Sequence, residues 1–211
     1  MRPLTLPLLA ALLAVPAAAQ SPWIVAPPSK IVQLGTFQDT ALSEASTAAA
    51  SRTQPGVIWT LNDSGNPAWV YAVDSAGHTL GIFLVVGGQN FDWETLTVSP
   101  CPAGNCLIIG DIGDNPETRP SVKLYRVPEP SVGGTAAGAL VATAPADSLI
   151  VRYADGPHDV EAMYADAAGD VFLVSKGRSK GILLFRIPAN AWLAEGPAVP
   201  EFVDSLPITP D

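Results

Sequence analysis

The feature that most constrains the fold of this chain is an internal repeat. Three units open with acidic segments: LSEAS (42–46), FDWETL (91–96) and HDVEAM (158–163). Each unit continues with an apolar run: VIWTL (57–61), CLII (106–109) and VFLV (171–174). Polar turns follow these runs: NDSGN (62–66), GDIGDN (110–115) and SKGRSKG (175–181). Because the same order of motifs returns, the sequence predicts one supersecondary unit repeated three times.

Two further segments complete each unit. A third segment has a shared pattern: VYAV (70–73), LYRV (124–127) and LFRI (184–187). A fourth is again apolar: TLGIFLVV (79–86), SLIVRY (148–153) and EFVDSL (201–206). Short runs rich in Val, Ile, Leu and aromatic residues between turn residues are typical of strands. The continuous apolar runs indicate burial on both faces of a sheet.

Four strands at a period of about fifty residues are typical of a β-propeller blade. Glu44 and Glu94 are 50 residues apart, whereas Glu94 and Glu161 are 67 apart. We expect the excess to be a loop insertion in the low-complexity segment 130–146. The expected fold is therefore all-β, a propeller of four-stranded blades at roughly 38–88, 89–154 and 155–207. A β-sandwich of the same strands is the alternative, although a sandwich does not require a repeated order of motifs.

Three blades do not close a ring, because propellers typically have about 4–8 blades. The segment KIVQLGTF (30–37) is predicted to be a spare strand of the kind that completes a last blade. We therefore expect the chain to be the N-terminal half of a six-bladed protein, or a fragment from an incomplete gene. A longer reading frame should continue with about three more units, and the complete protein is expected to be a monomer.

The N-terminus predicts export. Arg2 precedes an apolar stretch, and Ala17 and Ala19 occupy the −3 and −1 positions of a signal-peptidase site. Residues 1–19 are thus expected to be a signal peptide and residues 20–211 the propeller, secreted or periplasmic. No other run reaches the ~18 apolar residues of a membrane-spanning helix, so membrane insertion is not expected. Cys101 and Cys106 are the only cysteines; in an oxidising compartment they are expected to form a disulfide, with a free pair as the alternative.

The charge balance bears on partners. The chain has 20 acidic and 11 basic residues and a formal charge of −9, which argues against nucleic acid and anionic membranes as partners. The sequence contains no nucleophile elbow, zinc-protease motif or P-loop. A small-molecule ligand or substrate is expected, of a kind that the sequence leaves open.

Six segments carry a resemblance: SEAS, LNDSGN, FDWETL, GDIGDN, LYRVPEP and YADGPHDVEAMY. In them the chain resembles the secreted six-bladed propellers of the phytase-like, gluconolactonase-like and TolB-like groups, and most of all exported bacterial propellers without a characterised activity. The resemblance covers roughly 31–206. It implies a channel cation held by glutamate, asparagine and aspartate, or several calcium ions at the channel face. Such proteins include metal-dependent phosphatases, lactonases and proteins with no known catalysis, so the fold alone does not assign a function.

Acidic residues recur at the start of each unit and in the turns. Glu44, Glu94 and Glu161 are expected at matching places in the first strands, at one end of the channel. Asp92 and Asp159 precede their glutamates by two residues and should face the same side of the strand. The turns add further oxygen donors: Asn62, Asp63, Asp111, Asp114 and Asn115. Converging carboxylates repel one another, a divalent cation removes that penalty, and all-oxygen ligands favour Ca²⁺ or Mg²⁺; we expect Ca²⁺.

If the protein is an enzyme, the resemblance implies a metal-dependent hydrolase of phosphoesters, esters or lactones. Glu44, Glu94 and Glu161 would bind the metal or act as bases, and His158 is a candidate proton shuttle. The structural alternatives stay open. Asp and Asn are natural turn residues, the glutamates can accept backbone N–H bonds, and His158 can be a loop histidine bonded to a carboxylate. The second function is therefore a non-catalytic binding or scaffold propeller whose acidic turns are structural.

Overall fold

The computed structural model describes residues 32–134, 136 and 138–207. The chain divides into two units, Met1–Gln33 and Leu34–Asp211, and every strand named below belongs to the second unit. The expected signal peptide, 1–19, lies outside the described residues. Within the described part of the chain, no helix is long and apolar enough to cross a membrane.

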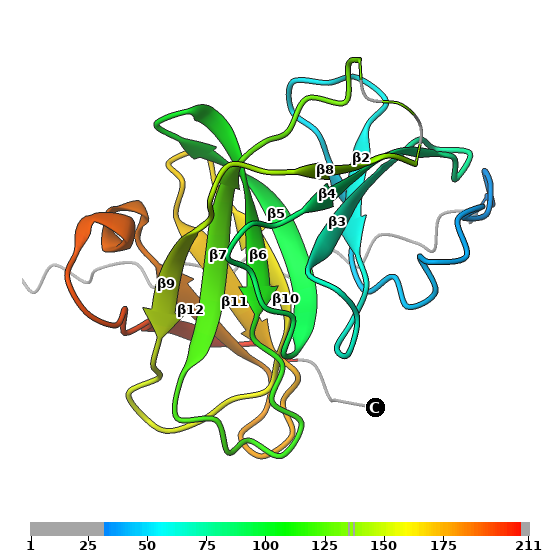
Figure 1. The fold of residues 1–211 in the computed structure, drawn as a ribbon. Helices are drawn as coiled ribbons and strands as arrows, with labels where there is room; N and C mark the ends of the chain where they lie inside the picture. Colours follow the sequence, from blue (N-terminus) through cyan, green and yellow to red (C-terminus); the bar gives the residue numbers. More distant parts are fainter. Residues whose placement is uncertain (1–31, 135, 137, 208–211) are drawn as a thin grey trace, which may run out of the picture. The chain divides into compact units, whose positions relative to one another are not determined.

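In the described part of the chain the fold is all-β, with three sheets of four or five strands (Figure 1). The first sheet has the order β1 (Ala49–Ala50), β2 (Ile58–Leu61), β3 (Trp69–Val73), β4 (Thr79–Leu84) and β8 (Leu140–Ala142). The second has the order β5 (Trp93–Cys101), β6 (Gly104–Asp111), β7 (Val122–Pro128) and β9 (Asp147–Val151). The third has the order β10 (Val160–Ala165), β11 (Val171–Ser175), β12 (Leu183–Ile187) and β13 (Glu201–Ser205). The first four strands of each sheet follow chain order and pair antiparallel.

The second sheet is buried on both faces. On one face Leu107 and Ile109 of β6 pack in a core with Trp59 and Phe83 of the first sheet. On the other face Ile108 packs in a core with residues of the third sheet, such as Leu173 and Phe185. Successive side chains of a strand point to opposite faces, so the unbroken apolar run of β6 supplies both cores. Burial on both faces, expected from that run, is confirmed.

Two expectations about the connections are wrong. The insertion at 130–146 is not only a loop, because it contains β8, which pairs in parallel with β4. Its residues Leu140 and Val141 can pair because the outer edge of β4 offers free backbone groups. The predicted strand at 30–37 is not a strand over Val32–Phe37, and residues 30 and 31 lie outside the described part. Gly35 instead lies so close to the backbone of Ala76 that a Cβ atom would collide with it.

The predicted disulfide joins Cys101 and Cys106, with Cα atoms 5.8 Å apart. The two cysteines lie at the end of the β5–β6 hairpin, where Cys101 pairs with Gly104 and Ser99 pairs with Cys106. Gly104 has φ of 104°, a conformation that favours glycine in this tight turn. The bond therefore closes a loop that the strand register already holds together.

Replacing both cysteines with serine should cost stability without changing the fold. The entropic model for a loop this short gives a loss of about 2 kcal/mol. Urea denaturation of the wild type and of the Cys101→Ser/Cys106→Ser variant measures the difference. A loss well above that value would mean that the disulfide also positions the hairpin.

Candidate cation site

One backbone contact is repeated in all three sheets. An acidic residue stands before or near the first strand, and its carbonyl accepts a hydrogen bond from an N–H just after the second strand. The three bonds are Asp63 N–H to Glu44 O (3.0 Å), Ile112 N–H to Asp92 O (3.1 Å) and Lys176 N–H to Asp159 O (2.7 Å). The residues that follow these three acids also have equivalent β-sheet partners: Ala45 pairs with Asn62, Trp93 with Asp111 and Val160 with Ser175. Glu44, Asp92 and Asp159 are therefore structural equivalents.

This equivalence corrects the expected alignment of the glutamates. Glu44 does not match Glu94 and Glu161; by register, the counterpart of Glu94 in the first sheet is Ser46. Glu44 lies in a bend outside β1, with its backbone bonded to the NDSGN turn rather than to a neighbouring strand. Glu94 and Glu161 do share a position, because the register shifts at each of them, between Trp93 and Thr95 and between Val160 and Ala162. Bulges of this kind redirect a side chain and often lie beside functional sites.

Three carboxylates meet between the first and second sheets. Ligand oxygens of Asp63, Asp92 and Glu94 all lie within 4.8 Å of one another. Asp63 comes from the turn after β2, Asp92 precedes β5, and Glu94 occupies the β5 bulge. We call these residues the carboxylate trio.

Asn90 positions two parts of the trio, and sequence reasoning missed it. Its amide donates to the carbonyls of Asn62 and Asp63, the latter at 2.8 Å. Its side-chain oxygen accepts from the N–H of Trp93 at 3.0 Å. Asn90 thus links the turn that carries Asp63 to the segment that carries Asp92 and Glu94. The available signal was an amide residue directly before FDWETL.

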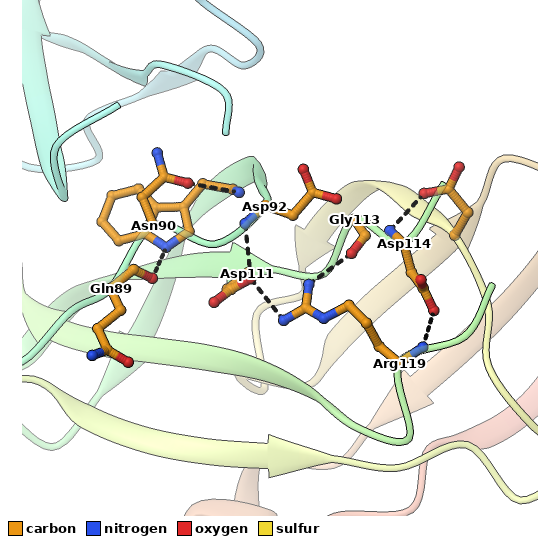
Figure 2. A network of polar contacts seen from close by, with 9 residues as sticks. Gln89, Asn90, Asp92, Asp111, Gly113, Asp114 and Arg119 are labelled. Atoms are coloured by element: carbon orange, nitrogen blue, oxygen red, sulfur yellow. Dashed lines mark hydrogen bonds and ion pairs between the residues drawn. The ribbon is translucent and has the colours of Figure 1, made fainter. Parts of the chain in front are cut away.

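Three neighbouring acidic residues have cationic partners. Arg119 pairs with Asp111 at 2.9 Å, Arg178 with Asp159 at 2.7 Å and Lys176 with Glu161 at 2.6 Å. Among the residues that the structure describes, no cationic side chain forms an ion pair with Asp63, Asp92 or Glu94. In Figure 2 the network reaches the backbone N–H of Asp92, and no contact is drawn to its carboxylate. The trio therefore has no ion-pair partner among the described residues, although the more distant charge of Arg119 partly offsets the rise in the pKa of Asp92.

Glu94 is the member of the trio whose surroundings most disfavour a negative charge. The residue is 7% exposed, and its side chain has no hydrogen bond to another described residue. Burial, together with the charges of Glu161 and Asp63, raises the pKa of Glu94 to about 8. Burial and the charge of Asp63 also raise the pKa of Asp92. A mostly buried carboxylate among other acids, with no hydrogen-bond partner, favours binding a proton or a cation.

Gly113 provides the space in which two of these carboxylates lie. A Cβ atom at this position would stand 2.5 Å from Asp92 Oδ2 and 2.6 Å from Glu94 Oε1. Any other residue would push the two side chains away. The trio and the glycine together fit a small cation with oxygen ligands. GDIGDN thus supplies the glycine beside the trio and none of the three carboxylates.

The other polar residues of GDIGDN hold the turns in place. Asp111 accepts from the N–H of Asp92 at 3.1 Å as well as from Arg119. Asp114 donates its N–H to Asp159 at 2.9 Å and accepts from the N–H of Arg119 at 2.7 Å. Asn115 accepts from Arg178. Asp111, Asp114, Asn115 and Asp159 therefore lie beside the trio, bonded to arginines and backbone groups.

The remaining predicted site residues lie apart from the trio or are bonded elsewhere. Glu44 accepts from the amide of Asn66 at 2.7 Å. Asn62 is buried and accepts from the N–H of Glu44 at 3.1 Å. His158 is buried against Tyr153 and lies 2.9 Å from a carboxylate oxygen of Asp155. This is the contact that the structural alternative for His158 describes.

No protein-family model, curated protein or solved structure matches the chain in the comparisons with known proteins. The function must therefore be argued from the site.

Without added cation, the free energy of unfolding should fall as the pH rises from the pKa of Glu94 in the unfolded state to its pKa in the folded state. That range runs from the ordinary value of 4.5 to about 8. In it the folded protein binds more protons than the unfolded protein, and so the free energy of unfolding decreases with pH. Urea denaturation of chelator-treated protein at pH 5, 6, 7 and 8 measures this slope.

Glu94→Gln should flatten the slope, whereas Glu195→Gln, at an exposed position, should leave it unchanged. An unaltered slope in Glu94→Gln would show that Glu94 is ionised without penalty.

Proposed function

We propose that this chain folds as blades of an exported β-propeller and binds Ca²⁺ at the carboxylate trio. The observation that carries the proposal is the convergence of Asp63, Asp92 and Glu94 without a cationic partner among the described residues, with Glu94 buried and unbonded. Nearby acids of the same cluster are neutralised by Arg119, Arg178 and Lys176. A bound divalent cation would complete that pattern.

The propeller part of the proposal draws on the sheet arrangement. Each sheet has four antiparallel strands in chain order, and the second sheet packs on the first and the third. The first strands lie side by side, since β5 contacts both β1 and β10. This is the arrangement expected when blades follow one another around an axis. The disulfide is compatible with export to an oxidising compartment.

Calcium is favoured over other metals by the ligand chemistry. The trio offers oxygen atoms alone, the donors that Ca²⁺ and Mg²⁺ prefer over thiolate or imidazole. Asp63 and Asp92 are half-buried rather than enclosed, so water can complete a coordination shell. Ca²⁺ tolerates irregular geometry and six to eight ligands, whereas Mg²⁺ demands a near-ideal octahedron.

A catalytic role is the further part of this proposal. If the protein is a hydrolase, the bound cation would polarise a phosphoryl or carbonyl oxygen of a phosphoester, ester or lactone. Glu161 and Lys176 lie beside the trio and would contact such a substrate. The second candidate is a binding or scaffold propeller, favoured by the structural contacts of Asp111, Asp114 and His158.

Adding Ca²⁺ to chelator-treated protein should raise the melting temperature. At a calcium concentration 100 times the Kd, binding stabilises the fold by about 2.7 kcal/mol, which corresponds to about 5–10 °C for a domain of this size. Calorimetric titration gives the Kd. Asp92→Asn and Glu94→Gln should each weaken binding at least about tenfold, or about 1.4 kcal/mol, while Glu195→Gln binds normally. Equal melting temperatures with Ca²⁺ and with EDTA would overturn the proposal.

Gly113→Ala should also weaken Ca²⁺ binding by about tenfold or more, because positions of ligands shift when supporting residues change. Its added methyl group displaces the Asp92 and Glu94 carboxylates. Gly133→Ala is the matched control, since among the described residues a Cβ there meets only the Ser131 hydroxyl, at 3.6 Å. Titration of both variants with Ca²⁺ makes the comparison. Wild-type affinity in Gly113→Ala would mean that the two carboxylates do not bind the ion together.

The catalytic part is tested separately with phosphomonoester, lactone and aryl-ester substrates in the presence of Ca²⁺. Turnover that is lost in Glu94→Gln would support hydrolysis. Calcium binding without turnover on any substrate would favour the binding propeller.

A further inference from the structure

A hollow of about 400 Å³ lies at the tip of the β5–β6 hairpin, and residues of the second and third sheets line it. Pro100 and Pro102 come from the hairpin. Trp192 comes from the 3-10 helix η1 (Ala189–Leu193), in the connection between β12 and β13. Arg126 of β7 also lines the hollow. The volume lies within the range of about 300–1,000 Å³ typical of small-molecule sites, whose walls are mostly apolar.

The hollow lies apart from the carboxylate trio. Glu94 stands near one end of β5 and Pro100 near the other. A strand rises about 3.3 Å per residue, so these two residues are roughly 20 Å apart. The hollow is therefore separate from the proposed Ca²⁺ site, and a ligand bound in it would not depend on Ca²⁺.

Arg126 is held in one orientation beside the hollow. Its Nε and Nη2 atoms donate to the same carboxylate oxygen of Asp147, at 3.2 and 2.7 Å. Its guanidinium lies 4.4 Å from the centroid of the Trp192 ring, and its side chain is only 16% exposed. Its Nη1 atom has no hydrogen bond to another described residue. A guanidinium that is already fixed and keeps an unused donor is suited to binding a further anion.

The equivalent arginine of the third sheet binds two carboxylates. The segment LFRI of β12 corresponds to LYRV of β7, so Arg186 is the counterpart of Arg126. Its Nη1 atom donates to Glu201 and its Nε atom to Asp170, both at 2.7 Å. Glu201 is the register partner of Arg186, as Asp147 is of Arg126. Arg126 therefore has the first of these two acidic partners and lacks the second.

Cys106 occupies the place of Asp170 in the second sheet. Phe172 pairs with the arginine of the third sheet, and Ile108 pairs with the arginine of the second. Asp170 and Cys106 each lie two residues before these partners. Cys106 is part of the disulfide and carries no charge. Arg126 is thus left with one carboxylate where its counterpart has two.

We propose that the hollow binds a small aromatic monocarboxylate. Its carboxylate would accept a hydrogen bond from Arg126 Nη1 and take the place of the missing acidic side chain. Its ring would pack against Trp192, Pro100 and Pro102, since aromatic rings gain most from apolar and aromatic surroundings. Asn190 also lines the hollow. The Asn190 amide has no hydrogen bond to another described residue, and it can donate to the second carboxylate oxygen.

One negative charge on the ligand fits this hollow better than two. Arg126 is the one charged residue among the described residues that line it, and Asp147 already shares that charge. The chain as a whole has a formal charge of −9, which repels polyanions such as phosphate esters. A carboxylate is also planar and matches the planar guanidinium.

NMR titration of the full chain with 2-naphthoate as the probe tests the proposal. The indole N–H signal of Trp192, identified with Trp192→Phe, should shift with a Kd below about 1 mM. The signals of Trp59 and Trp93, whose indoles donate to Glu129 and to the carbonyl of Gln89, should not shift. 2-Naphthamide has the rings without the charge, and acetate has the charge without the rings. Each should bind at least about tenfold more weakly than 2-naphthoate.

Two variants locate the carboxylate. Arg126→Gln should weaken the binding of 2-naphthoate at least about tenfold, whereas Arg152→Gln, which removes the same charge at an exposed position, should bind it normally. Asn190→Asp is the second variant, because Asn190 is exposed and its replacement should change stability little. The added negative charge beside Arg126 should also weaken binding.

Three results would overturn the proposal. The first is a Trp192 signal that does not move at about 10 mM 2-naphthoate. The second is equal affinity for 2-naphthoate and 2-naphthamide, which would mean that the charge is not recognised. The third is wild-type affinity in both Arg126→Gln and Asn190→Asp, which would place the ligand elsewhere.

Discussion

Burial of both faces of the β5–β6–β7–β9 sheet is the constraint on which the rest of the structure depends. Leu107 and Ile109 must be covered on one side and Ile108 on the other. Two more sheets provide that cover, and because each uses its strands in chain order, the first strands β1, β5 and β10 come together. The acidic residues at the starts of these strands are then neighbours. The candidate cation site is therefore a consequence of how the cores pack.

Acidic residues gathered in this way repel one another. A basic side chain offsets this repulsion in the third sheet, but its equivalent in the first sheet does not. Lys176 and Asp63 occupy the same place, each donating its N–H to the acid that precedes the first strand. In the third sheet Lys176 neutralises Glu161. In the first sheet the equivalent residue is itself an acid, and it adds to the charge around Glu94 and Asp92. The difference between lysine and aspartate at this place thus gives an ion pair in one repeat and, in the other, a group of carboxylates without an ion-pair partner among the described residues.

The strands and their order could be predicted because the apolar runs and the turn residues are local signals. The all-β class and the three sheets follow from them, whereas the disulfide was predicted from the only two cysteines, Cys101 and Cys106, and the expected export. The sequence predicted that Glu44 is equivalent to Glu94, which is wrong. The glutamates that recur in the sequence are two residues out of step with the residues that make equivalent hydrogen bonds. The strand β8 was missed for a related reason: Leu140–Ala142 is a strand because β4 has a free edge, not because of its own composition. Asn90 gave no signal of its own, since an amide bonded to two carbonyls looks like any loop asparagine.

The sequence by itself determined which segments become strands, where turns fall and that oxygen donors abound, since period-2 burial and turn chemistry act over a few residues. Only the tertiary structure decided which acids meet and which are neutralised. Arg119, Lys176 and Arg178 come from turns of two different sheets, and their reach depends on packing. In GDIGDN the sequence pointed to the two aspartates, but the fold bonds them to Arg119 and leaves Gly113 to make room for Asp92 and Glu94. The reason is that electrostatic energy depends on distances through space, which separation along the chain does not determine.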